Sequence, residues 1–339
     1  MTIDGILPRL VERRDLSPGD AYRMMGLIMD GKVTPAQTGA LLTALRMKGE
    51  TPGEIAAMAR AMRERALVIS PRFARPSLDT CGTGGDGTGT FNISTAAAFV
   101  AAGAGIPVVK HGNRSVSSRC GSADLLEAAG VGLAVPPPLL ADICERVGIC
   151  FLYAPTHHPA MKHVLAPRRE IGIRTVFNLL GPLSNPAGAD VQLTGVYTPE
   201  LTEKVADVLR LLGTRRAMVV HGDGLDEITT TGGTDVAELI DGVICTYRIH
   251  PSTFGIPVAT RADLAGGDPA ASARVLREIL GGGRGPLRDI VVLNAAAAIH
   301  LAGGARDIHE GLRVAASSVD TGAALEKLDR LVEATGGRP

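Results

Sequence analysis

The chain has 339 residues and carries 35 basic and 35 acidic side chains, which gives a formal net charge of zero at pH 7. A neutral protein is a poor candidate for a nucleic-acid binder, because contact with a phosphate backbone requires a basic surface. Only 3% of the residues are aromatic and none is Trp, so a platform that stacks bases is also disfavoured. The length is sufficient for one large domain or two smaller ones, each with a buried core.

The cysteine and apolar patterns predict a cytoplasmic protein. The five cysteines include no C-x-x-C pair, which is typical of a reduced protein without a zinc or disulfide framework. The chain reaches Arg13 and Arg14 before any long apolar segment, so we expect no signal peptide. The longest apolar run, 290–302, is interrupted by Asn294 and His300. It is too short to span a bilayer and predicts a buried helix, so we expect no membrane partner.

The first 72 residues are predicted to form a small helical domain. Three segments begin with a hydroxyl side chain followed three residues later by an acid or amide, which is the pattern of a helix N-cap: Ser17 with Asp20, Thr34 with Gln37, and Thr51 with Glu54. Pro35 and Pro52 occupy first helical positions, where no N–H is needed. Gly31 and Gly49 are predicted helix ends. Short connections favour antiparallel packing, and we expect a later helical segment near 165–185 to join this domain.

Residues 73–339 are predicted to form a larger α/β domain. Short apolar runs indicate buried strands at Ile106–Val109, Ile149–Tyr153, Val191–Val196 and Ala217–His221. Helical segments are expected between them, among others at Ala96–Ala104, Leu139–Val147 and Leu201–Leu212. This alternation predicts a mostly parallel central sheet flanked by helices. Residues 236–249 alternate around Asp241-Gly242, which predicts an antiparallel hairpin, and the last 70 residues are predicted to be mostly helical.

The segment 79–95 is the strongest functional motif. It reads Asp-Thr-Cys-Gly-Thr-Gly-Gly-Asp-Gly-Thr-Gly-Thr-Phe-Asn-Ile-Ser-Thr. Its five glycines allow the backbone to approach a ligand closely and to direct N–H groups toward it. Asn92, Ser94 and Thr95 add side-chain donors just before the apolar helix, and a helix N-terminus favours anions. We interpret the segment as a cradle for a diphosphate, distinct from both the P-loop and the Rossmann fingerprint.

A second motif follows the predicted strand at 106–109. It reads Lys-His-Gly-Asn-Arg-Ser-Val-Ser-Ser over residues 110–118. Lys110 directly follows that strand, and open α/β sheets bind ligands at the carboxyl ends of their strands. Asn113, Ser117 and Ser118 supply neutral donors, and Ser122 is predicted to cap a helix that begins at Ala123.

Two further groups of polar residues are candidates for a site. Asp226 and Glu227 follow the predicted strand at 217–221, and adjacent carboxylates suit Mg²⁺, which prefers a few carboxylates together with phosphate and water oxygens. Three histidines, at 157, 158 and 163, lack the spacing of a zinc site. We expect these histidines to line an aromatic substrate pocket instead.

These segments resemble the anthranilate phosphoribosyltransferase family, in which C-G-T-G-G-D-G, F-N-I-S-T and K-H-G-N-R are signature stretches. The resemblance covers essentially the whole chain, with further matching segments at 157–163, 168–174, 175–186, 224–229 and 291–295. One departure is Cys120, which stands where a serine or another small residue is expected. We expect Cys120 to serve only in packing, so the departure changes no predicted role.

The resemblance implies how two substrates and a metal are held. Phosphoribosyl diphosphate is expected to contact Gly82, Gly85, Asp86, Thr90, Asn92, Ile93, Ser94, Thr95, Lys110, His111, Gly112, Asn113, Arg114, Ser115, Val116, Ser117, Ser118 and Ser122. Anthranilate is expected to contact Gly82, Asn113 and Arg168, and a guanidinium matches a carboxylate better than an ammonium does. Two Mg²⁺ ions per monomer would be positioned by Ser94, Asp226 and Glu227. The resemblance also implies a small helical domain beside a larger α/β domain, a homodimer, and catalytic roles for Lys110, Asp226 and Glu227.

The chemistry expected from this resemblance is transfer of a phosphoribosyl group from diphosphate to nitrogen. An aryl amine is neutral at pH 7 and attacks without first losing a proton, so we expect no dedicated general base; His111 is the nearest candidate. One alternative is a pyrimidine nucleoside phosphorylase of the same architecture, which typically reads Lys-His-Ser-Thr-Gly-Gly where this chain reads Lys-His-Gly-Asn-Arg. The other is a non-catalytic relative that binds nucleic acid, which the balanced charge disfavours.

Overall fold

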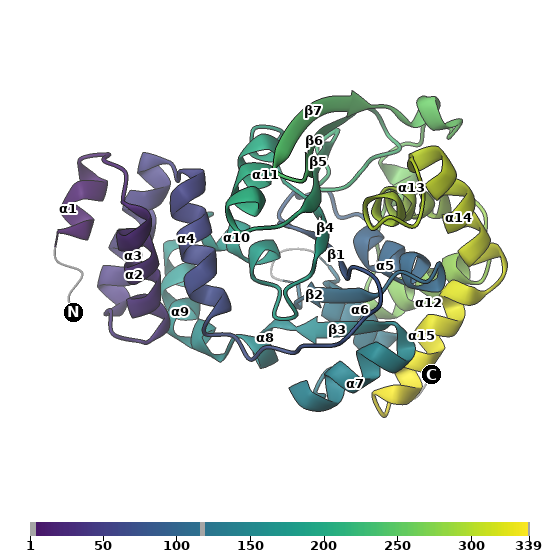
Figure 1. Cartoon of the computed structure of the whole chain (residues 1–339), viewed down its shortest axis with the longest axis horizontal. Helices are drawn as coiled ribbons and strands as arrows, with labels where there is room; N and C mark the ends of the chain where they lie inside the picture. The colour runs from purple at the N-terminus through teal and green to yellow at the C-terminus, as the bar shows by residue number, and fades with distance from the viewer. Residues whose placement is uncertain (1–4, 116–118, 338–339) are drawn as a thin grey trace.

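The computed structural model describes residues 5–115 and 119–337. A helical bundle near the N-terminus lies beside a larger part built on a β-sheet (Figure 1). The bundle begins with α1 (Ile6–Val11), α2 (Pro18–Met29), α3 (Pro35–Lys48) and α4 (Pro52–Arg63). This arrangement of a small helical domain and a large α/β domain confirms the predicted fold class.

Local side-chain chemistry starts the helices of the bundle where the sequence predicts. The hydroxyl of Ser17 accepts a hydrogen bond from the backbone N–H of Asp20 at 3.1 Å. The helices that follow Thr34 and Thr51 both begin with a reciprocal capping box. Such caps satisfy N–H groups that have no partner within the helix, and each typically stabilises a helix by about 1 kcal/mol. The three predicted helix starts are therefore confirmed.

Two later helices complete the bundle. α9 (Lys162–Ile171) packs against α2 and α3, and α10 (Phe177–Leu180) packs against α4. Val164 of α9 and Leu180 of α10 share an apolar cluster with Met24, Leu45 and Met58 of the first helices. The segment between about 162 and 180 therefore returns to the bundle after the chain has passed through the first half of the sheet.

The described strands form one sheet in the order β3-β2-β1-β4-β5-β6-β7. β1 to β5 are parallel, and β6 and β7 form an antiparallel hairpin at one edge. Both the mostly parallel sheet and the hairpin at 236–249 are as predicted. The strands are β1 (Leu78–Gly82), β2 (Val108–Gly112), β3 (Ile149–Tyr153), β4 (Val191–Gly195), β5 (Arg216–Gly222), β6 (Thr234–Ile240) and β7 (Val243–Ile249).

Helices cover both faces of the sheet because the strands alternate their side chains between two cores. In β5, Met218 and Val220 belong to one apolar cluster, while Ala217 and Val219 belong to the other, as expected for side chains that point to opposite faces. α5 (Ile93–Gly103) and α13 (Pro286–Leu301) pack on the first face, and α11 (Leu201–Leu211) joins α4 on the second. The apolar run 290–302 is indeed a buried helix, almost entirely within α13.

The remaining elements lie around the sheet, largely on the side away from the bundle (Figure 1). They are α6 (Ser122–Ala128), α7 (Pro137–Val147), α8 (Ala154–His157), α12 (Pro269–Leu280), α14 (Ile308–Asp320) and α15 (Ala323–Ala334), with short 3₁₀ turns η1 (Pro159–Met161), η2 (Pro182–Ser184), η3 (Pro251–Phe254) and η4 (Ala262–Leu264). The helical character predicted for the last 70 residues is confirmed.

Three local predictions are wrong in detail. β2 begins at Val108 rather than at Ile106, because Pro107 has no N–H to offer a strand ladder. It continues to Gly112, so Lys110 lies within the strand and not after it. α5 begins at Ile93, three residues before its predicted start.

The predicted helix cap at Ser122 is also wrong. α6 already includes Ser122, and its N-cap is Gly121. The hydroxyl of Ser122 donates to the carbonyl of Asn113 at 3.2 Å. The carboxylate of Asp124 instead satisfies the free N–H of Gly121 at 2.9 Å.

Candidate active site

The candidate site lies at the carboxyl ends of the parallel strands, where the loops after β1 and β5 meet. Asp226, after β5, reaches back to the glycine-rich loop after β1, and its Oδ2 accepts the backbone N–H of Gly84 at 2.7 Å. A Cβ on residue 82 would collide with this carboxylate. Glycine at position 82 is therefore required for the acidic residue to pack against the loop.

Glu227 makes the second connection between these loops. Its Oε1 accepts the backbone N–H of Ser94, in the first turn of α5, at 3.1 Å. The next residue, Ile228, is fixed by Asn294 of α13, which donates to its carbonyl at 2.8 Å and accepts its N–H at 3.0 Å. Since Asn294 is fully buried, the loop that bears both carboxylates is anchored in the core.

Lys110 lies between the two loops. Its side chain is buried, and its ammonium donates to the carbonyl of Thr80 and, at 3.3 Å, to the hydroxyl of Ser94. Burial lowers the pKa of Lys110, and the nearby carboxylates of Asp79 and Glu227 oppose that shift. Lys110 thus brings positive charge to the place where the sequence predicts a diphosphate.

The two acids form a site of excess negative charge. Both residues keep part of their surface exposed, yet protein atoms crowd their carboxyl groups. This burial, with help from Asp86, raises the pKa of Asp226 to about 7. Burial and the neighbouring Asp226 also raise the pKa of Glu227, while Lys110 opposes the rise. A bound cation would relieve this repulsion.

The donor set fits Mg²⁺. Asp226, Glu227 and the Ser94 hydroxyl offer hard oxygen atoms, and Mg²⁺ usually completes its shell with phosphate and water oxygens. Within residues 5–115 and 119–337 no cluster of three or more His, Cys, Asp or Glu side chains could hold a metal alone. The substrate would therefore have to supply several of the ligands.

The glycine-rich loop is held by contacts within it and near its junction with α5. The N–H and hydroxyl of Thr88 both bind the carboxylate of Asp86, at 3.2 and 2.7 Å. Thr90 forms an isolated bridge with Ala265, and Asn92 donates to the carbonyl of Cys120 at 3.0 Å. The side chains of Ile93 and Thr95 are buried, and their backbone N–H groups already donate to the carbonyls of Phe91 and Asn92 at 2.8 and 3.2 Å.

In the loop after β2, the polar groups of two residues are already bound to other side chains of the protein. The guanidinium of Arg114 is already bound to Glu127 at 2.7 Å, to Asp124 at 3.0 Å and to the hydroxyl of Tyr153 at 3.2 Å. The N–H of Ser115 donates to Asp124 at 2.9 Å. Arg114 and Ser115 therefore support the shape of the loop. The predicted donor-site residues Val116, Ser117 and Ser118 lie outside the described residues.

A separate group of residues forms the predicted acceptor side. Arg168, near the end of α9, is half-buried with its guanidinium 5.1 Å from the ring centre of Phe177. Burial lowers the pKa of Arg168, although arginine remains charged at neutral pH. A partly desolvated guanidinium of this kind favours an incoming carboxylate.

Buried imidazoles lie near the second motif. The rings of His111 and His158 are 5.1 Å apart, and the Nε2 atoms of both are buried with no hydrogen-bond partner among the described residues. Burial lowers the pKa of His111 to about 3 and that of His158 to about 4, so both rings are neutral. By contrast, His157 binds the carbonyl of Leu67 at 2.6 Å, and His163 lies against Gly31 of the bundle.

The sequence reasoning missed two residues that shape this site. Asn294 lay in a matching segment and interrupted an apolar run, but a hydrophobic pattern gives no role to a buried amide. Arg174 binds the carbonyl of Gly85 in the glycine-rich loop. Arg174 lay inside a matching segment, but no local signal distinguished it from an arginine without a partner in the loop.

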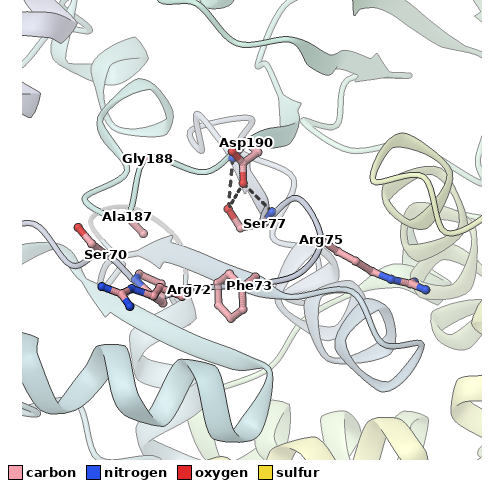
Figure 2. A pocket seen from close by; sticks show the side chains of 9 residues that line it. Ser70, Arg72, Phe73, Arg75, Ser77, Ala187, Gly188 and Asp190 are labelled. Carbon is pink, nitrogen blue, oxygen red and sulfur yellow. Dashed lines mark hydrogen bonds between the residues drawn. The ribbon is translucent and has the colours of Figure 1, made fainter.

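A cavity of about 410 Å³ lies elsewhere, at the amino ends of β1 and β4 (Figure 2). Ser77 closes part of it by donating its N–H and its hydroxyl to Asp190, each at 2.8 Å. Since parallel strands place their carboxyl ends on the opposite edge, this cavity is separate from the acidic pair. It is lined by Ser70, Pro71, Arg72, Phe73, Arg75, Ser77, Ala187, Gly188 and Asp190.

Comparison with known proteins shows the family to which the chain belongs. Residues 5–66 match the helical bundle domain of the glycosyl transferase family, and residues 74–325 match its a/b domain. The anthranilate phosphoribosyltransferase of Methanocorpusculum labreanum is 55% identical over 332 residues, which is 98% of each chain. The chain belongs to the anthranilate phosphoribosyltransferase family. A second family member, from Moorella thermoacetica, is also 55% identical, over 96% of each chain.

Solved structures of anthranilate phosphoribosyltransferases have the same fold. The enzyme of Thermus thermophilus is 45% identical, with a TM-score of 0.93 over 97% of this chain and 99% of that one. The enzyme of Saccharomyces cerevisiae, solved in complex with PRPP and Mg, is 29% identical with a TM-score of 0.87 over 98% of each chain. As a member of this family the chain is a glycosyltransferase that moves a phosphoribosyl group. A pyrimidine nucleoside phosphorylase also moves a pentosyl group, so it is the identity to anthranilate phosphoribosyltransferases over nearly the full length, and not the class of reaction, that disfavours that alternative. No helix in the described ranges is long and apolar enough to cross a membrane.

Proposed function

We propose that the chain transfers the 5-phosphoribosyl group of phosphoribosyl diphosphate to the amine of anthranilate, in the biosynthesis of L-tryptophan. The products are N-(5-phosphoribosyl)anthranilate and diphosphate. The observation that carries the proposal is the pair of hydrogen bonds that fix Asp226 to Gly84 and Glu227 to Ser94. These hydrogen bonds hold the proposed cation site against the proposed diphosphate cradle. Membership of this family supports the same assignment.

The donor lies along the glycine-rich loop, the start of α5 and the loop after β2. Ser94, Asp226 and Glu227 would hold Mg²⁺, two ions per monomer, which would supply positive charge to neutralise the diphosphate. Lys110 and the N–H groups of the loop stabilise the charge that develops as the bond from C1′ to the diphosphate oxygen breaks. The electron pair of that bond leaves with the diphosphate.

The acceptor lies between the donor and α9. Arg168 holds the carboxylate of anthranilate, Asn113 helps to orient the molecule, and Gly82 lies near both substrates. The amine forms the new bond to C1′ and then loses its extra proton to solvent or product. Since a pKa of about 3 makes His111 a weak base at neutral pH, positioning and electrostatics account for most of the rate.

Three further features belong to the same proposal. The protein acts as a homodimer in the cytoplasm, without nucleic-acid or membrane partners. Its helical domain comprises residues 1–72 with a returning segment near 165–185, and residues 73–339 form the domain that binds the donor. Val11 and Met47, on the surface of the bundle, are 68% and 70% exposed in the single chain, which suits contact with a second subunit.

Loss of anthranilate fluorescence tests the function directly. The purified protein, anthranilate and phosphoribosyl diphosphate should give a steady decrease in fluorescence that requires Mg²⁺. Chromatography should show N-(5-phosphoribosyl)anthranilate and diphosphate in equal amounts. Turnover of a pyrimidine nucleoside with inorganic phosphate, without any reaction of anthranilate, would contradict the proposal.

A further inference from the structure

The glycine-rich loop fixes little of its own conformation beyond the hydrogen bonds between Thr88 and Asp86. Gly84, Gly85, Gly87 and Gly89 all have positive φ angles, between 64° and 76°. Glycine adopts such angles without strain, but it also leaves the unbound backbone free to adopt many others. Contacts from outside the loop must therefore select the conformation that receives a ligand.

Arg174 provides one of these contacts from the segment between α9 and α10. Its guanidinium donates to the carbonyl of Gly85 and lies 4.3 Å from the ring centre of Tyr197. The backbone N–H of Tyr197 in turn donates to the hydroxyl of Thr83 at 3.2 Å. Arg174 and Tyr197 thus hold two neighbouring positions of the loop from the same side.

The contact with Gly85 fixes the direction of a whole peptide group. In a planar trans peptide the C=O and the following N–H point in opposite directions. When Arg174 holds the Gly85 carbonyl, the N–H of Asp86 has to point away from Arg174. A carbonyl turned toward the ligand would repel an anion, whereas an N–H attracts one.

We propose that Arg174 is a positioning residue for the donor, which keeps the Gly85 carbonyl turned away from the diphosphate so that the loop presents N–H groups to it. Arg174 lies six residues after Arg168, across the end of α9. The segment that carries the acceptor's arginine therefore also shapes the donor loop. This inference rests on the proposed function, because the anion is the diphosphate of the donor.

The first test is the kinetics of Arg174→Ala. Loss of a charge-assisted hydrogen bond at an exposed side chain should raise the KM for phosphoribosyl diphosphate about tenfold. The kcat at saturating substrates should also fall, by no more than about tenfold, because the loop N–H groups stabilise the charge on the departing diphosphate. The KM for anthranilate should stay within about twofold, because anthranilate does not contact this peptide group. An unchanged donor KM, or a loss confined to kcat, overturns the proposal.

Four further variants distinguish a positioning role of Arg174 from a simple effect of its charge. Arg174→Lys should recover only part of the donor affinity, because an ammonium cannot lie flat on the Tyr197 ring while it binds the carbonyl. Tyr197→Phe should behave as the parent protein, whereas Tyr197→Ala should raise the donor KM as Arg174→Ala does. Arg169→Ala removes an equally exposed charge on α9 and should leave the donor KM unchanged. Full recovery by lysine, or an equal effect of Arg169→Ala, overturns the positioning role.

A measurement without turnover distinguishes this inference from the proposed function. Amide hydrogen exchange in residues 83–89 of the substrate-free protein should be at least several-fold faster in Arg174→Ala than in Arg169→Ala. Mg²⁺ with inorganic diphosphate should protect the loop at a lower concentration in the Arg169 variant. Equal exchange in the two variants overturns the inference, even if anthranilate is turned over. Faster exchange in Arg174→Ala supports it, even if another acceptor is used.

Discussion

The backbone N–H of Ser94 donates to Oε1 of Glu227 at 3.1 Å, across 133 residues of sequence. The hydrogen bond joins the first turn of α5 to the loop after β5. Because Asn294 fixes that loop from the buried helix α13, the carboxylate is in place before any ligand binds. The acidic pair and the glycine-rich loop therefore form one preassembled candidate site, and both parts should be needed for activity.

The first prediction concerns metal dependence. EDTA should abolish turnover of anthranilate and Mg²⁺ should restore it, because the donor alone leaves the carboxylates unneutralised. The double variant Asp226→Asn with Glu227→Gln keeps the shape of both side chains but removes their charge. It should lose most activity, by at least about 10²-fold, while its far-UV circular dichroism stays unchanged. Full activity of this variant would remove both residues from the metal site.

Asp223→Asn is the matched control for that experiment. Asp223 is an exposed acid of the same loop, and its carboxylate binds the hydroxyl of Thr231 at 2.8 Å. Its substitution should leave the dependence on Mg²⁺ as it is in the parent protein. An equal loss in Asp223→Asn would point to general disturbance of the loop and not to metal binding.

The second prediction concerns stability and pH. Burial raises the pKa of Asp226 to about 7, so the fold disfavours the ionised carboxylate. The cost is absent below the ordinary pKa near 4, grows as the pH rises toward 7, and is constant above it. Asp226→Asn has no such cost. At pH 8 its melting temperature, measured by calorimetry without metal, should exceed that of the parent by on the order of 2 °C.

This difference should shrink as the pH is lowered from 8 to 5, because the parent carboxyl then becomes protonated. Asp223→Asn should show no such dependence. Added Mg²⁺ and donor should stabilise the parent more than Asp226→Asn, since binding to the folded state raises its stability. A variant that is less stable than the parent at pH 8 would contradict the account of charge repulsion at this site.

The sequence predicted those parts of the fold that depend on local chemistry. Ser17, Thr34 and Thr51 start helices because each cap lies within four residues of its partner. The apolar runs located β3, β4 and β5 because buried parallel strands are continuously apolar. β1 was not assigned as a strand, since Asp79 and Thr80 are polar yet fully buried. Their partners come from other parts of the chain, among them Asn185 at 2.7 Å from Asp79.

The sequence predicted which residues belong to the candidate site, but not which of them contact one another. The motifs predicted a loop for a diphosphate and an acidic pair for a metal, and the structure brings the two segments together. The contact between Ser94 and Glu227 requires the sheet order that brings β1 and β5 to either side of β4. Arg174 was missed for the same reason, because its partner Gly85 is 89 residues away. Pro107 did carry a local signal against a strand that begins at Ile106, and it shifted β2 by two residues.

The third prediction concerns His111. Its pKa of about 3 means that the ring is neutral at pH 7 and accepts a proton only weakly. Loss of a true general base typically costs about 10²–10⁴-fold in rate. We expect His111→Ala to lower kcat by less than about 10²-fold and to leave the shape of the pH profile between 5 and 9 unchanged. A fall beyond about 10³-fold, with the fold preserved, would overturn the mechanism without a base.

The last prediction concerns Arg168, whose half-buried guanidinium is supported by the ring of Phe177 and is proposed to hold the acceptor's carboxylate. A charge-assisted hydrogen bond contributes roughly 1.5–3 kcal/mol, and a paired contact lies at the upper end. Arg168→Ala should therefore raise the KM for anthranilate on the order of 10–200-fold. The KM for phosphoribosyl diphosphate should move much less, because the donor contacts other loops.

Arg168→Lys should recover only part of the loss, because an ammonium cannot make the planar two-point contact of a guanidinium. Arg169→Ala is the matched control, since it removes the adjacent charge from the exposed side of α9. The decisive measurement is the pair of KM values for each variant, obtained by varying one substrate at saturation of the other. If the donor KM rises in Arg168→Ala while the anthranilate KM stays fixed, Arg168 belongs to the phosphate side, and the acceptor must lie elsewhere along the same edge of the sheet.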